Sequence, residues 1–237
     1  MAVTINGDGT ISGINVGGLP DGVVDSGTLA TGIDATKLAD GTVTSAELQY
    51  INTLSSNAQT QIDGAGGAWV QLDSQAASDD ASLDYTGITT TYGTYAIVLT
   101  HMMPATDGAI GAFRVGDSGG FDSGASDYEW VYQRQNPGSA GYEGSVDAAD
   151  TYLVNFSPDV GSAAGEGISA TLYLRTGANV GTVTMDGAYS GVNGANDLRG
   201  GTVWGHKLTA ITCDRVQFLF TTGNVASGQM VIYGLTK

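Results

Sequence analysis

The fold class follows from one stretch of the chain, Ile168-Ser-Ala-Thr-Leu-Tyr-Leu-Arg175. Apolar residues occupy every second position in it, which is the pattern of a β-strand with one buried and one solvent-facing side. The same alternation recurs at Val216, Phe218 and Phe220, and where Tyr128, Trp130 and Tyr132 alternate with Glu129, Val131 and Gln133. These three segments indicate antiparallel β-structure.

Shorter apolar segments predict the other strands of the same domain. They lie near residues 69–72, 95–102, 110–115, 152–156, 182–188, 203–208 and 230–235, and clusters rich in Gly, Asp and Asn separate them at 116–124, 136–144, 161–167 and 191–201. No helical period follows residue 64. About ten strands with such turns predict a mainly β domain over 65–237, an antiparallel β-sandwich and most simply a jelly roll.

Composition excludes several classes of function. The 237 residues include 24 acidic and 8 basic side chains, for a net charge of −16, whereas a nucleic-acid groove needs clustered Lys and Arg. The longest apolar stretches, such as 96–99, fall far short of the ~20 residues that span a bilayer, and no basic, apolar secretory signal opens the chain. Cys213, the one cysteine, permits no internal disulfide and makes a zinc cluster improbable.

The first 64 residues differ in composition from the rest. Tyr50 is their one aromatic residue, against 18 in 65–237, so residues 1–64 lack the apolar area to fold alone as a globule. The segment 21–29 repeats at 40–48 with Asp, Gly, Val, Ser and Leu in register. We expect 1–43 to be an extended strap that lies on a partner or winds with its copies; a disordered tail is the alternative.

A helix is predicted over 44–64. Thr44 and Glu47 have the spacing of a reciprocal capping box, and apolar residues then recur at a mean spacing of 3.5, the period of a coiled-coil seam. The seam consists of Leu48, Ile51, Leu54, Ala58 and Ile62. A helix this short is marginal alone, so we expect it to self-associate. A single amphipathic helix packed on the following domain is the alternative.

The run 44–63 also resembles a helical segment common in tailed-phage fibre proteins, with the approximate pattern T-x-A-E-L-x-Y-L-x-x-h-x-S-N-h-Q-T-Q-h-D. Ile51 replaces the usual leucine, and Ser55 stands where the family varies. The beginning, 5–13, and the end, 227–235, are similar to fibre N-termini and to closing strands of phage appendage domains. The resemblance implies a virion protein, on the tail or the head, with an N-terminal attachment segment, a trimeric stem and an outward β-domain.

No pattern of a catalytic site is found. The chain lacks G-x-S-x-G, H-E-x-x-H and a P-loop, and we interpret His101 and His206 as structural, hydrogen-bonded histidines in strands. We therefore expect no enzyme activity and no cofactor. Cys213 is interpreted as a small buried apolar residue.

Two candidate binding sites remain. The carboxylates of Asp117, Asp122 and Asp127 could offer oxygen ligands to Ca²⁺, although a solvated turn explains them as well. Four aromatic residues could stack on a sugar, although aromatic residues at alternate strand positions are usually core. They are Trp130, Tyr132, Tyr142 and Trp204.

Together these features predict a non-enzymatic phage structural protein, a short homotrimeric fibre for host-surface adhesion. Its predicted partners are other virion proteins and a host-surface glycan or protein, with no nucleic acid and no membrane insertion. A head fibre or capsid decoration protein is the main alternative, and a polysaccharide-degrading tailspike is a third.

Overall fold

The structure is a computed structural model that describes residues 68–137, 141–156, 159–176 and 182–235, together with residues 4, 5, 7, 11, 12, 44, 46, 47 and 50. The chain divides into two units, Met1–Ala65 and Gly66–Lys237. Among the described residues there is no helix with the length and apolar composition needed to cross a membrane.

Two local features are described in the first unit. Strands β1 (Thr4–Ile5) and β2 (Ile11–Ser12) pair as an antiparallel hairpin. The predicted capping box is formed: Glu47 accepts hydrogen bonds from the backbone N–H and the hydroxyl of Thr44 at 2.8 and 2.7 Å, and its own N–H donates to the Thr44 hydroxyl at 3.3 Å. The Thr44 bonds, the backbone one foremost, lower the pKa of the Glu47 carboxyl.

The predicted seam that follows this cap lies outside the described residues. This applies to all five of its members, Leu48, Ile51, Leu54, Ala58 and Ile62. The coiled-coil stem and the trimer therefore stay predictions.

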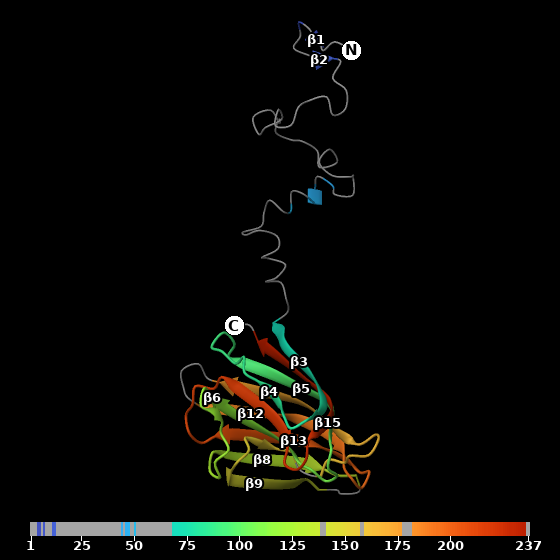
Figure 1. Ribbon diagram of the computed structural model, residues 1–237, viewed down its shortest axis with the longest axis vertical. Helices are drawn as coiled ribbons and strands as arrows, with labels where there is room; N and C mark the ends of the chain where they lie inside the picture. Colours follow the sequence, from blue (N-terminus) through green and yellow to red (C-terminus); the bar gives the residue numbers. More distant parts are fainter. Residues whose placement is uncertain are drawn as a thin grey trace. The chain divides into compact units, whose positions relative to one another are not determined.

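The second unit is built on an eight-stranded antiparallel sheet (Figure 1). In spatial order its strands are β3 (Trp69–Asp80), β15 (Val225–Leu235), β5 (Thr94–Pro104), β11 (Gly167–Thr176), β12 (Val183–Val192), β13 (Leu198–Lys207), β8 (Tyr128–Gln135) and β9 (Glu143–Asp150). Strands β11, β12 and β13 form a continuous meander, and β3 and β9 are the two edges.

A smaller antiparallel sheet covers one face of the large sheet. It contains β10 (Val154–Asn155), β6 (Gly111–Asp117), β14 (Arg215–Phe220) and β4 (Leu83–Tyr85) in this order, and β7 (Gly120–Phe121) pairs with β6. The two sheets share one hydrophobic core. We call the face of the large sheet toward this core its inner face and the opposite one its outer face.

Aromatic rings and one glycine join the two sheets. The ring of Phe156, just after β10, lies 5.5 Å from that of Tyr189 on β12. Within the smaller sheet, Phe113 lies 5.3 Å from Phe218. On β13, Gly205 leaves so little space that a Cβ there would lie 1.6 Å from the Leu153 carbonyl oxygen. The sheets therefore meet backbone to backbone at this point.

The structure confirms the mainly β, antiparallel prediction. Along β11, the predicted inward residues Ile168, Ala170, Leu172 and Leu174 are buried, and all ten predicted strand segments contain strand. The prediction missed β4, β7 and β9. Part of β9 and all of β7 lie in segments predicted as turns, and seven of the eight residues of β9 are exposed, so this edge strand has no alternating apolar pattern to reveal it.

Candidate functional site

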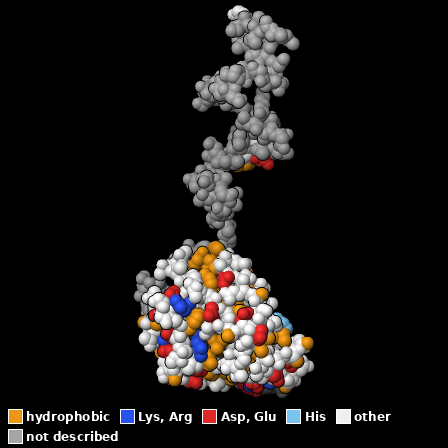
Figure 2. Space-filling model, in the orientation of Figure 1, with side chains coloured by type: hydrophobic (Ala, Val, Ile, Leu, Met, Phe, Trp, Pro, Cys, Tyr) orange, Lys and Arg blue, Asp and Glu red, His pale blue; other side chains and the backbone are white. Residues whose placement is uncertain are grey.

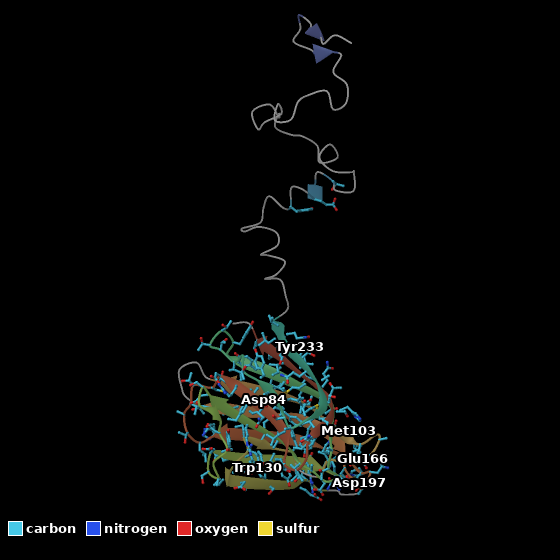
Figure 3. All side chains as sticks on the ribbon, viewed as in Figure 1. Asp84, Met103, Trp130, Glu166, Asp197 and Tyr233 are labelled. Atoms are coloured by element: carbon cyan, nitrogen blue, oxygen red, sulfur yellow. The ribbon has the colours of Figure 1, made fainter. Side chains whose placement is uncertain are left out.

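Two of the four predicted stacking residues lie side by side on β8. The rings of Trp130 and Tyr132 are stacked, with centroids 5.7 Å apart and planes inclined by 12°. The Trp130 indole N–H donates to Asp150 at 2.5 Å, and the guanidinium of Arg134 lies 5.9 Å from the Tyr132 ring. Trp130, labelled in Figure 3, belongs to the end of the domain that β8 and β9 form. Both rings are half-buried.

The other two aromatic residues lie elsewhere. Trp204 on β13 pairs with Val131, and directly opposed residues share a face while successive residues alternate. Trp204 and Val131 therefore lie on the outer face, whereas Trp130 and Tyr132 share the inner side with buried Tyr128. Tyr142 precedes β9 and is 72% exposed. The four residues thus form no single stacking platform, because the register of β8 and β13 separates them.

The structure instead shows a groove on the outer face over β12, β13, β8 and β9, with a volume of ≈ 450 Å³. One cross-strand row forms its floor: Asp186 pairs with Trp204, Trp204 with Val131, and Val131 with Val146. Trp204, Val131 and Val146 are 43%, 37% and 71% exposed. Three apolar side chains thus lie together with much of their surface open to water.

Polar side chains border this apolar row. His206 Nδ1 lies 2.9 Å from Glu129 Oε1, and both side chains are partly exposed. Asp186 forms an ion pair with Arg175 of β11. Thr184, opposite His206 in the register, adds a hydroxyl to the lining. Acceptors and donors of hydrogen bonds therefore surround the apolar row on a shallow surface, the mixture that is typical of ligand sites.

The carboxylates of the acidic loop contact a cation of the chain itself. Lys207 Nζ lies 3.3 Å from Asp122 and 3.3 Å from Asp127, and its side chain is 2% exposed. Asp117 lies apart and accepts the N–H of Gly119 at 2.8 Å. The three residues proposed for Ca²⁺ thus do not converge, because an ammonium group lies against two of them. Within the described ranges, no group of three or more His, Cys, Asp or Glu side chains could hold a metal ion.

Tyr128 contacts the same cluster of Lys207, Asp122 and Asp127. Its ring lies 5.2 Å from Lys207 Nζ, and its hydroxyl donates to the carbonyl groups of Val115 and Asp122 at 2.9 and 3.1 Å. Burial strongly raises the pKa of this phenol. The hydroxyl therefore stays protonated and joins the loop to β6.

The histidines and the cysteine differ in part from the prediction. His101 lies in a strand as predicted, at a β-bulge with φ 49° and an exposed side chain, and its backbone N–H donates to the Ser169 hydroxyl at 2.9 Å. His206 has the expected hydrogen-bond partner in Glu129. Cys213 is half-buried rather than buried; burial raises the pKa of its thiol to about 12.

Charge is sparse on the surface of the β-domain. On the face shown in Figure 2, acidic side chains are scattered among uncharged ones, and Lys and Arg gather at only a few places. Comparisons with protein-family models, curated proteins and solved structures find no match to this chain. Function is therefore inferred from the chemistry of the described residues and from the sequence.

Proposed function

We propose that this chain is a non-enzymatic structural protein of a tailed-phage virion, a short trimeric fibre for adhesion to a host surface. In this proposal, residues 1–43 attach to the particle and residues 44–64 form a trimeric coiled-coil stem. Residues 65–237 form a jelly-roll-like sandwich that presents its outer face to the host.

One observation carries the proposal. A β-domain with an open groove around Trp204 follows directly on a segment whose sequence resembles phage-fibre stems and whose capping box is formed. Contiguous exposed apolar side chains with a polar rim are typical of interaction surfaces. The chain would thus combine a surface for adhesion with a segment for trimerisation.

Trimerisation would supply the affinity that one groove lacks. A shallow groove that is open to solvent binds a ligand weakly, since little of the ligand loses contact with water. Three linked copies convert the second and third binding events into intramolecular ones, which raises overall affinity by roughly 10²–10⁴-fold on a repetitive surface. The scarcity of long charged side chains suits display in many close copies.

The mass of the full chain in solution tests the stem. Because one chain has a mass of 24.1 kDa, sedimentation equilibrium should give about three times that mass. Replacing the predicted seam residues Ile51 and Leu54 by Asp should give the monomer, whereas Asn52→Asp, a matched change off the seam, should leave the trimer intact. A monomeric mass for the unaltered chain would count against the proposal.

An activity assay tests the proposed absence of catalysis. Incubation of the chain with capsular and lipopolysaccharide preparations should release no new reducing ends. Their release would favour the polysaccharide-degrading tailspike.

A further inference from the structure

We infer that the Trp204 groove binds a saccharide chain that carries no acidic groups. This inference rests on the proposed function, because it names the ligand of the same adhesive surface. It concerns the outer face of the large sheet; of the stacked pair, Trp130 is among the residues that line the groove and Tyr132 is not.

The floor of the groove matches the apolar side of a sugar ring. A pyranose presents several C–H groups on one face, and these pack against the electron-rich face of an aromatic ring. Trp204 offers the largest ring for this contact and is 43% exposed. Val131 and Val146 extend the apolar surface along the same row, so the contact continues beyond one ring.

The border of the groove matches the hydroxyl groups around a sugar ring. Carboxylates accept hydrogen bonds from hydroxyls, and bonds to a charged acceptor are stronger than those between neutral groups. Glu129 and Asp186 supply carboxylates, Thr184 a hydroxyl and His206 a ring nitrogen. A purely apolar ligand would exclude water from these groups and offer them no hydrogen bonds in return, which disfavours lipids and aliphatic chains.

Charge selects among sugars. Of the described residues that line the groove, Glu129, Asp147 and Asp186 are acidic and none is Lys or Arg. Asp186 is paired with Arg175, while Glu129 is paired with His206. Sulfate, phosphate or carboxylate groups on a ligand would meet like charge here and in a chain with a net charge of −16. Neutral and amino sugars are therefore favoured.

The register favours an oligosaccharide over a single sugar. Tyr173 on β11 pairs with Asp186, which pairs with Trp204, so two aromatic side chains on one face stand two strands apart, roughly 10 Å. The Tyr173 ring lies 6.0 Å from that of Trp69, measured between centroids, and its centroid lies 6.0 Å from the guanidinium of Arg175. A sugar chain lying across the strands could contact both rings. The groove itself, whose lining does not include Tyr173, has a volume of ≈ 450 Å³, within the range of small-ligand sites, roughly 300–1,000 Å³, so a longer sugar chain would extend beyond it towards Tyr173.

The test uses the full chain and two sets of immobilised probes. One set contains hexasaccharides of glucose, mannose, galactose, N-acetylglucosamine and glucosamine; the acidic set contains hyaluronan fragments and dextran sulfate. We expect binding to at least one member of the first set and none to the second. Trp204→Ala should weaken that binding at least tenfold, and Val146→Ser, which removes apolar surface from the same row without adding charge, should weaken it at least threefold. Tyr142 is an exposed aromatic residue outside the groove, so Tyr142→Ala is the matched control and should change the affinity less than twofold.

Three results would overturn the inference: no binding to any neutral or amino probe, equal binding to the acidic set, or unchanged binding by Trp204→Ala with its native melting temperature retained. None of these results contradicts the proposed function if the chain is a trimer and is located on the particle, because the oligomeric state and the location are both measured without saccharide. Conversely, if the chain is a monomer and binds sugar through Trp204, the proposed trimeric fibre is wrong and the inference that the groove binds saccharide is supported.

Discussion

Substitution of Gly205 by Ala tests how the two sheets of the β-domain meet. A Cβ at this position would lie 1.6 Å from the carbonyl oxygen of Leu153 and 3.0 Å from Val154. Ordinary contact begins near 3.4 Å, so the Leu153 backbone would have to move by about 1.8 Å. Leu153 is fixed in turn, since its N–H donates to the carbonyl of Phe113 at 2.8 Å.

The expected loss of stability follows from this geometry. Overpacking of a core costs about 1–3 kcal/mol when side chains can adjust, and here backbone opposes backbone, so we expect a loss of at least ~3 kcal/mol. For a domain of this size, 1 kcal/mol lowers the melting temperature by about 2–4 °C. Gly205→Ala should therefore melt at least about 6 °C below the unaltered chain.

Gly200→Ala is the matched control. Gly200 lies on the same strand, β13, and the nearest atom to its added Cβ would be the Tyr189 carbonyl oxygen at 3.5 Å, an ordinary contact. This variant should be as stable as the unaltered chain or more stable by about 0.4–1 kcal/mol. Calorimetry of the full chain measures both. Equal melting temperatures for Gly205→Ala and Gly200→Ala would refute the close approach of β13 to Leu153.

Three further perturbations test other parts of the molecule. Lys207→Met leaves Asp122 and Asp127 without their cation, and should cost about 2–4 kcal/mol in urea unfolding, below the full cost of a broken buried pair because the carboxylates are 30% and 27% exposed; no loss would contradict the cluster. The pKa of the Cys213 thiol is raised to about 12, so alkylation at pH 8.5 should be at least ~100-fold slower in the native chain than in urea. Because burial disfavours the thiolate, the contribution of Cys213 to the free energy of unfolding falls as pH rises from about 9 towards 12. Equal alkylation rates in the native chain and in urea would refute the burial of this thiol. Thr44→Ala removes the cap of the stem and should lower its helix stability by about 1 kcal/mol, seen by circular dichroism as an earlier loss of helical signal on heating; an unchanged midpoint would argue against the capped stem.

Alternation along one strand predicts which of its residues share a side. It does not predict which residues of neighbouring strands lie together, because that depends on the register between strands. Within β11, the period of two assigned Leu172 and Leu174 to the core correctly. Within β8 it also placed Trp130 and Tyr132 on one side. It could not tell that Trp204 pairs with Val131 and so faces the other way, because register between strands is set by packing and by turns.

The acidic loop is a second case in which contacts between residues far apart in the chain could not be predicted. Asp122 and Asp127 look like calcium ligands when only their neighbours in sequence are considered. Lys207, which lies between them in space, is 80 residues from Asp127 in the chain. The groove was missed for a related reason: Val146 lies on an edge strand without an apolar pattern, and Val131 occupies the polar phase of its strand. An exposed apolar residue at a polar position was the one available signal.

The position of the chain on intact particles tests the central proposal most directly. Immunogold electron microscopy of purified particles, with a tag at the C-terminus of the full chain, measures it. We predict gold at projecting appendages of the tail, away from the particle body; gold over the capsid would instead favour the head fibre or decoration protein. Absence of the chain from the purified particles would contradict the proposal that it is a virion protein.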